Sequence, residues 1–373
     1  MIWLAAPALA GAAYYLLAIV AAARWRGSRG TTAPWGEPPP LSILKPVRGR
    51  DPRFYEAIRS HAEQDYPEFE ILFGVADPQD PAIEDIERLR REYPHRRISL
   101  HVIRTDAPNA KAGVLAELTR QARFPLLLVN DSDIRVEPGY LRSVTAPLAD
   151  QAVGLVTCLY RARAEGWPSR FEALGIATEF APSVLVARML GQAEFALGST
   201  MVFRAAVLRE AGGFEAIADY LADDYQLGCH IHRRGYRIVF APDVVETDLG
   251  GESWKQTWKH QVRWSRTIRV SRPQGYYGYV VTHATFWSLV AFAAGDWWAG
   301  AAALGLRTIA GVWIGAGILK DRRALADAWL IPLRDLFGFA VWLAGAAGKT
   351  VEWRGQKLRL SADGKIRREI ESR

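Results

Sequence analysis

The segment LLLVNDSDIRV, residues 126–136, runs through four apolar residues and then changes abruptly to Asn-Asp-Ser-Asp. A short apolar run followed by carboxylates is typical of a buried strand in an α/β sheet, where ligands bind in the crevice outside the carboxyl ends of the strands. Two aspartates separated by one small residue suit a hard divalent cation, which in turn binds phosphates. A solvated turn is the alternative, since Asn, Asp and Ser all favour turns.

Strands and helices are predicted to alternate around this segment. This alternation predicts a mostly parallel sheet with ligand-binding crevices at the strand ends. An acidic residue, Asp77, follows a second predicted strand, which favours the ligand-binding interpretation over a turn. The predicted strands are 41–44, 69–75, 98–103 and 126–129, and the predicted helices are 52–64, 81–92 and 110–122.

The composition argues against several classes of protein. The 373 residues carry a formal net charge of +7, yet no run of lysine and arginine is long enough to indicate nucleic-acid binding. The arginines lie close to apolar segments instead, which favours an anionic membrane surface or a phosphorylated substrate as the partner. The two cysteines, Cys158 and Cys229, have no metal-type spacing, so neither a disulfide framework nor a zinc site is predicted.

An apolar segment at residues 2–23 is uncharged and about the length needed to span a bilayer. Positive charges follow it at Arg24, Arg26 and Arg29, whereas a signal peptide has a basic start before its apolar core. We therefore predict a retained transmembrane anchor over 1–25 and, by the positive-inside rule, a cytoplasmic location for the polar region after it. A linker at residues 26–40 ends in three prolines and leads into a polar domain at residues 41–250.

Apolar segments return in the C-terminal third of the chain, over residues 275–348. Residues 275–295 and 297–319 are predicted to form a helical hairpin that turns at Asp296. Arg307 lies near the middle of the second segment. Because a charge is costly in lipid, Arg307 is expected to face protein, a cavity or the interface.

A third apolar segment, 336–348, follows Arg334 and Asp335 and is too short to span a bilayer comfortably. A span there would also place the basic tail, residues 349–373, on the far side of the membrane, against the positive-inside rule. We therefore expect a re-entrant or interfacial piece at 336–348 and a cytoplasmic tail.

A third acidic site lies in YLADDYQLG, residues 220–228, where Asp223 and Asp224 precede an amphipathic segment. We expect both residues near a helix start, where negative charge is favourable. A purely structural role as N-cap or first-turn acids is the alternative.

The segment WKQTWKHQVRWSRTIR, residues 254–269, belongs to a predicted interfacial helix over residues 251–274. His260, Arg263 and Trp264 share one face of this helix, because residues three and four apart are neighbours. The alternative is a helix whose tryptophans and basic residues merely sit among lipid headgroups, and both descriptions are compatible.

Four segments carry a resemblance to a known family: SILKPVRGRDP (42–52), FEILFGVADPQDPAI (69–83), NDSDIRV (130–136) and ADDYQLG (222–228). Together with the late Arg263-Trp264 pair, they resemble the D,D,D,(Q/R)xxRW signature of inverting, membrane-bound family 2-type glycosyltransferases. More narrowly, they resemble the ceramide glucosyltransferase-like family (family 21), which includes bacterial enzymes that glycosylate hopanoid lipids. The likeness covers roughly residues 41–270. One departure is His260, which occupies the usual Gln or Arg position with Gln261 beside it.

The resemblance implies roles for the acidic residues. Asp77 would bind the uridine or ribose of a nucleotide-sugar. Asp131 and Asp133 would hold its diphosphate through Mg²⁺ or Mn²⁺, which neutralises the leaving group. Asp224 would be the general base that deprotonates the acceptor hydroxyl, with Asp223 as the alternative.

The resemblance also implies roles for basic residues and a fold. Arg263 and Trp264 would close over the diphosphate and the acceptor entrance. Lys45 and Lys111 are further candidates for phosphate contact, and a solvated lysine is an equal alternative for each. The expected fold is a GT-A α/β catalytic domain at residues 41–250, with an N-terminal transmembrane helix and C-terminal membrane helices.

The leading hypothesis is an integral membrane enzyme that moves a hexose or N-acetylhexosamine from a UDP-sugar to a lipid hydroxyl, on ceramide or a hopanoid polyol. A processive polysaccharide synthase shares the acidic triad, but it would need more spanning helices to form an export channel. A non-catalytic nucleotide-sugar-binding membrane protein would not need Asp224, because a pure binder needs no base.

Overall fold

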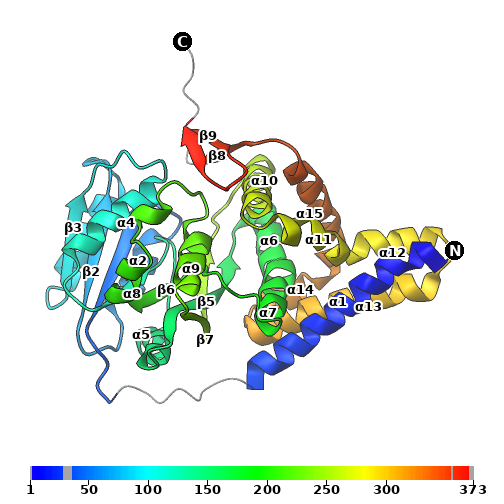
Figure 1. Cartoon of the computed structure of the whole chain (residues 1–373), viewed down its shortest axis with the longest axis horizontal. Coiled ribbons are helices and arrows are strands. Elements are labelled where there is room, and N and C mark those ends of the chain that lie inside the picture. Colours follow the sequence, from blue (N-terminus) through cyan, green and yellow to red (C-terminus); the bar gives the residue numbers. More distant parts are fainter. Residues whose placement is uncertain (1, 28–35, 354–355, 369–373) are drawn as a thin grey trace, which may run out of the picture.

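The computed structural model describes residues 2–27, 36–353 and 356–368, and a seven-stranded sheet forms its centre (Figure 1). The strand order is β3-β2-β1-β4-β6-β5-β7. Strands β1 to β4 are parallel, β6 is antiparallel to both of its neighbours, and β5 pairs parallel with β7. The strands are β1 (Leu41–Val47), β2 (Phe69–Val75), β3 (Arg97–Val102), β4 (Leu126–Val129), β5 (Val153–Arg163), β6 (Met201–Arg204) and β7 (Arg237–Asp248).

Helices cover both faces of the sheet. Ile43 of β1 packs in one core with residues of α2 and α3, whereas Leu44 packs in another with residues of α4, α8 and α9. Because both faces are buried, β4 is apolar along its whole length. These helices and the short turns beside them are α2 (Phe54–Ala62), α3 (Ala82–Glu92), α4 (Ala110–Gln121), α5 (Tyr140–Thr145), η1 (Ala146–Ala149), α8 (Ala205–Glu210), η3 (Glu215–Ile217) and α9 (Asp223–Arg233).

The predicted alternation of strands and helices between residues 41 and 129 is confirmed. The strands at 69–75 and 126–129 have the predicted bounds, and the other elements differ by three residues or fewer at each end. The fold class, a mostly parallel α/β sheet, is therefore confirmed as well.

A group of membrane-type helices projects away from the sheet (Figure 1). Among the described residues, three helices are long and apolar enough to cross a membrane, by length and composition: Ala5–Trp25, Trp297–Ile318 and Ala328–Ala346. The first lies within α1, and α1 packs along α13 and α12. The elements of this region are α1 (Ile2–Gly27), α11 (Pro273–Gly278), η4 (Tyr279–Thr282), α12 (Ala284–Ala293), α13 (Trp297–Val312), η5 (Trp313–Ile318), α14 (Arg322–Ala326), η6 (Ala328–Leu330) and α15 (Ile331–Ala346).

The first arm of the predicted hairpin, residues 275–295, is not one continuous helix. Short helical turns occupy its first part, and a new helix, α12, begins only after His283 and has 10 residues. At 1.5 Å per residue, a helix of that length covers about half of a bilayer core. The predicted hairpin does form, since α12 packs against α13 across the turn at Asp296.

The prediction that the third apolar segment is too short to span is wrong. The helix Ala328–Ala346 has 19 residues and is apolar enough to cross a membrane. Arg334 and Asp335 precede the apolar run in the sequence, yet both lie inside α15 and are only 4% and 3% exposed. They are tolerated there because each has a charged partner inside the protein.

Arg307 faces protein, one of the three environments predicted for it. Its side chain is fully buried and forms an ion pair with Asp335, with Nη2 2.6 Å from Oδ1. Asp335 also accepts a hydrogen bond from Thr285 Oγ1 at 2.6 Å. The guanidinium of Arg307 lies 5.0 Å from the ring centre of Tyr15 in α1. One buried charge pair thus connects α1, α12, α13 and α15.

Three helices lie between the sheet and this bundle in Figure 1: α6 (Gly166–Gly175), α7 (Ala181–Met189) and α10 (Trp254–Ser271). A π-helical turn, η2 (Ile176–Phe180), joins α6 to α7. The basic tail forms a small antiparallel sheet of β8 (Thr350–Trp353), β9 (Gln356–Leu360) and β10 (Ile366–Arg368). The tail sheet contacts the α/β domain, since Ile366 N–H donates to the carbonyl of Asp219 at 2.7 Å.

We expect Asp335→Asn to destabilise the protein by about 3–5 kcal/mol, because it leaves the buried guanidinium of Arg307 without a counter-charge. Thermal unfolding of the detergent-solubilised protein measures this change. The double variant Arg307→Leu/Asp335→Leu removes both charges and should recover most of the lost stability. A single variant as stable as the wild type would contradict this role of the pair.

Candidate active site

Asn130 and Ser132 alternate with the two aspartates after β4, and both anchor the loop. Asn130 is fully buried, and its amide donates to Tyr140 Oη at 2.9 Å and to the carbonyl of Ser199 at 3.1 Å. Ser132 Oγ donates to a carboxylate oxygen of Asp51 at 2.5 Å. The loop is therefore fixed from several directions, which leaves Asp131 and Asp133 available for chemistry.

Lys111 connects the two acidic sites that lie far apart in the sequence. Its ammonium lies 2.6 Å from Oδ1 of Asp131 and 3.3 Å from Oδ2 of Asp223. Although burial opposes it, the negative charge of Asp131, Asp223 and Asp224 raises the pKa of Lys111. The Asp131 side chain is 43% exposed, whereas that of Asp223 is 8% exposed. Asp131 thus remains accessible to a ligand while it is paired.

Lys45 lies beneath the same loop. It is fully buried in β1, the strand next to β4, and its ammonium donates to the carbonyl of Asp131 at 3.1 Å. Burial lowers the pKa of Lys45 to about 7, while the charges of Asp133 and Asp131 act in the opposite direction. Lys45 therefore supports the loop from inside the sheet.

Asp133 is half-buried, and its carboxylate accepts a hydrogen bond from Thr247 at the end of β7. Burial, followed by the charge of Asp131, raises the pKa of Asp133 to about 6. A hollow beside Asp133 is also lined by Arg53 and Arg163. The sequence alone did not indicate these neighbours, because they come from distant segments.

Asp224 lies in the first turn of α9, where the sequence predicted it. Its carboxylate accepts hydrogen bonds from the N–H of Gly198 at 2.8 Å and from its neighbour Tyr225 at 2.7 Å. Burial, followed by the charge of Asp223, raises the pKa of Asp224 to about 6, against the effect of Lys111. A carboxylate with this pKa is mostly ionised at neutral pH and is still basic enough to accept a proton.

Gly198 lies between the two acidic sites. A Cβ atom added to it would be 3.2 Å from Oδ2 of Asp131 and 3.2 Å from Oδ2 of Asp224. The segment 196–204 begins with a turn, in which Thr200 N–H donates to the carbonyl of Leu197 at 3.0 Å. Gly198 lies in this turn, and its N–H positions the carboxylate of Asp224.

Asp77 is exposed after β2, at the same edge of the sheet as Asp131. Its carboxylate accepts the N–H of Gln79 at 2.9 Å, which forms a local turn. The carboxyl ends of β1, β2 and β4 lie side by side in the sheet, so Asp77 is positioned at one side of the crevice.

The helix α10 carries the four remaining candidates. His260 and Trp264 share a face, as predicted, with their rings 4.6 Å apart. Gln261 is buried and accepts a hydrogen bond from Arg334 of α15 at 3.1 Å. Arg263 lies close enough to Glu252 for its charge to affect that carboxylate.

Tyr160 of β5 lies near the aspartates and also near Glu172, which contacts His260 of α10. Burial, followed by the charges of Asp224 and Glu172, raises its pKa. Its ring lies 5.4 Å from that of Phe180, and Phe180 lies 6.5 Å from Trp264. The six residues Lys45, Lys111, Asp131, Asp133, Asp223 and Asp224 therefore form one cluster, and Tyr160 lies close to it.

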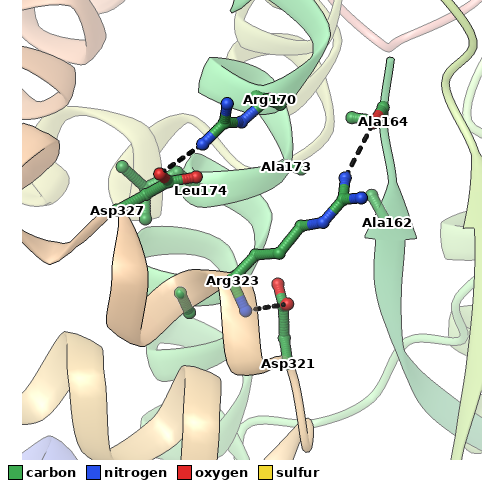
Figure 2. A pocket seen from close by; sticks show the side chains of 9 residues that line it. Ala162, Ala164, Arg170, Ala173, Leu174, Asp321, Arg323 and Asp327 are labelled. Atoms are coloured by element: carbon green, nitrogen blue, oxygen red, sulfur yellow. Dashed lines mark hydrogen bonds and ion pairs between the residues drawn. The ribbon is translucent and has the colours of Figure 1, made fainter. Parts of the chain in front are cut away.

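A small, open pocket lies elsewhere, between α6 and α14 (Figure 2). Arg170 pairs with Asp327 at 2.6 Å, and Arg323 donates to the carbonyl of Ala164 at 2.9 Å. Both arginines are thus engaged in holding α14 against the α/β domain. The acidic cluster, not this pocket, is the candidate active site.

Residues 3–366 match the profile of glycosyl transferase family 21. The chain belongs to this family. It is 30% identical over 208 residues to "Ceramide glucosyltransferase 1" of Caenorhabditis elegans, a match that covers 54% of this chain and 44% of the relative. It is 34% identical over 114 residues to a "Ceramide glucosyltransferase" of Komagataella phaffii, which covers 28% and 22%. The matches thus span less than half the length of these relatives.

A solved structure supports the family's GT-A fold for this chain. The mannosyltransferase PcManGT from Pyrobaculum calidifontis, in complex with GDP-Man and Mn²⁺, superposes with a TM-score of 0.56. The superposition covers 92% of the family 21 chain and 97% of PcManGT, at 20% identity.

We expect Gly198→Ala to destabilise the protein by about 1–3 kcal/mol, since the new methyl group crowds two carboxylates and the Gly198–Asp224 hydrogen bond. Thermal unfolding in detergent measures the change. Gly139→Ala is the matched control, because a Cβ there meets nothing within 4 Å, and it should stay within about 0.5 kcal/mol of the wild type. Equal stability of the two variants would show that the turn adapts freely.

Proposed function

We propose that this family 21 protein is an inverting glycosyltransferase that moves a hexose or N-acetylhexosamine from a UDP-sugar to a hydroxyl of a membrane lipid. The observation that carries the proposal is the cluster of Asp131, Asp133, Lys111 and Asp224 at the carboxyl ends of the parallel strands. It offers acidic and basic groups for a diphosphate and, beside Gly198, a carboxylate with a raised pKa.

The donor diphosphate is proposed to bind at Asp131 and Asp133 with Mg²⁺ or Mn²⁺. The two side chains fit such an ion, because both offer oxygen ligands and the charge of Asp131 raises the pKa of Asp133, a repulsion that a cation relieves. When bound, the ion would neutralise charge on the leaving diphosphate. PcManGT, which has the same fold, was solved with GDP-Man and Mn²⁺. Lys111 would add a positive charge, and Asp77 would contact the nucleoside.

Asp224 is proposed to act as the general base. Its carboxylate takes the proton of the acceptor hydroxyl while that oxygen forms a bond to the anomeric carbon, and the bond from this carbon to the diphosphate breaks. Attack opposite the leaving group inverts the anomeric configuration. The N–H groups of Gly198 and Tyr225 hold the carboxylate in place. Arg263 and Trp264 are proposed to line the approach of the donor and acceptor.

The acceptor is proposed to be a membrane lipid alcohol, either ceramide or a hopanoid polyol. The names of the relatives support a ceramide-like lipid. The three spanning-type helices would hold the site at the bilayer surface, so that the acceptor need not leave the membrane. The arginines after α1 favour a cytoplasmic catalytic domain.

We expect membrane fractions to form a glycolipid when UDP-glucose or UDP-N-acetylglucosamine is supplied with ceramide or a hopanoid polyol and Mg²⁺ or Mn²⁺. Asp224→Asn should lower the rate by at least about 10²-fold, because it removes the proton acceptor. Thin-layer chromatography of labelled lipid measures the product. Asp223→Asn, which removes the alternative base, is the paired variant.

Other outcomes of this assay would redirect the proposal. Released sugar polymer without glycolipid would indicate a polysaccharide synthase. Binding of a UDP-sugar without any product would indicate a non-catalytic protein. Full activity of Asp224→Asn together with loss of activity in Asp223→Asn would identify Asp223 as the general base.

The transfer rate should fall as the pH decreases through about 6, because protonated Asp224 cannot accept the acceptor proton. Asp223 raises the pKa of Asp224, so Asp223→Asn should move this acid limb to lower pH. Lys111 lowers the pKa of Asp224, so Lys111→Met should move the limb to higher pH. The dependence of kcat/KM on pH measures both shifts. If the acid limb of this profile stays at the same pH in both variants, the titration belongs to a group other than Asp224.

A further inference from the structure

A second group of potential metal ligands lies outside the aspartate cluster. Glu172 of α6, Glu252 before α10 and His260 within α10 each direct one ligand atom to a common region, and these atoms lie within 4.8 Å of one another. The start of α10 is well fixed: Glu252 N–H donates to Ser169 Oγ at 2.9 Å, and Ser253 and Gln256 form a capping box. The three residues are therefore brought together by a defined backbone.

The polar atoms of this group lack the hydrogen bonds that burial normally requires. The Glu172 side chain is 0% exposed, and neither of its carboxylate oxygens has a hydrogen-bond donor. Nδ1 of His260 lies 2.8 Å from Oε1 of Glu172, yet no hydrogen bond joins them. Oε2 of Glu252 is also buried and unsatisfied. A buried carboxylate without donors is strongly unfavourable, so such groups are normally paired or bind a metal.

We propose that Glu172, Glu252 and His260 bind a divalent transition-metal ion, with Zn²⁺ preferred. One imidazole nitrogen and two carboxylate oxygens form a ligand set that Zn²⁺ accepts, with a fourth position left for water. Mn²⁺ suits carboxylates as well, but binds more weakly to a given site of this kind.

The proposed metal would connect α6 to α10, the helix that carries Arg263 and Trp264. It also gives a physical reason for the histidine at position 260, where the family signature has Gln or Arg, since only histidine among these three ligates a metal readily. This site is separate from the Asp131–Asp133 pair, and it does not depend on which sugar or lipid the enzyme uses.

Metal analysis of the full chain in detergent tests the proposal. The background is Asp131→Asn/Asp133→Asn, which removes the aspartate pair, and the purified protein carries no histidine tag. After chelation, incubation with Zn²⁺ and desalting, we expect one retained equivalent of zinc by mass spectrometry. Adding His260→Ala or Glu172→Gln should weaken zinc binding by roughly tenfold or more. His232→Ala, a mostly exposed histidine beyond this group, should retain the metal.

Thermal unfolding with and without Zn²⁺ gives a second readout. Zinc should raise the Tm of the background protein and of His232→Ala, but not that of the His260 and Glu172 variants. Glu252→Gln serves if Glu172→Gln fails to fold, because the Glu252 side chain is partly exposed. A folded background protein that retains no zinc would overturn the proposal and leave a His260–Glu172 charge pair. The proposal would also be overturned if zinc is retained to the same extent after each of the three ligand substitutions.

Discussion

The ammonium of Lys111 is the interaction on which the acidic cluster depends. Asp131 follows β4 and Asp223 begins α9, about 90 residues later, and without a cation between them these like charges would repel each other. The pairing fixes the distance between the loop after β4 and the first turn of α9. Asp224, next to Asp223, is thereby held beside Gly198. Burial, followed by the charge of Asp223, raises the pKa of Asp224, and Lys111 acts in the opposite direction.

Buried charges in the membrane-type helices are also paired with opposite charges. Arg307 is compensated by Asp335, and Arg334 lies 3.2 Å from Glu179 in the π-helical turn η2. These pairs impose geometry, because a buried charge that loses its partner costs several kcal/mol. They fix how α13 and α15 pack against the turn that joins α6 to α7. In the group of Glu172, Glu252 and His260, Glu172 lies 2.8 Å from His260 but its buried oxygens accept no hydrogen bond, and this deficit is the basis for the proposed zinc site.

The sequence predicted the sheet between residues 41 and 129 because local signals agree there: apolar runs, helix periodicity and acidic residues at strand ends. It also placed Asp131, Asp133 and Asp224 at the carboxyl edge and at a helix start. The pairing of Lys111 with Asp223 and of Asp133 with Thr247 could not be predicted, since each joins segments about 110 residues apart in sequence. The third spanning-type helix could not be predicted from the sequence for a related reason. Arg334 and Asp335 look like the end of an apolar segment until their partners in other helices are known.

Arg334 of α15 also contacts two elements outside the membrane-type helices. It donates to Gln261 of α10 and pairs with Glu179 of η2, so one side chain of a spanning-type helix supports both elements that flank the candidate site. A truncated, soluble version without α15 would leave Glu179 without this counter-charge and Gln261 without its donor. The packing of α15 is therefore coupled through Arg334 to both α10 and η2, so a change in the position of this spanning-type helix would be transmitted to the elements beside the candidate site.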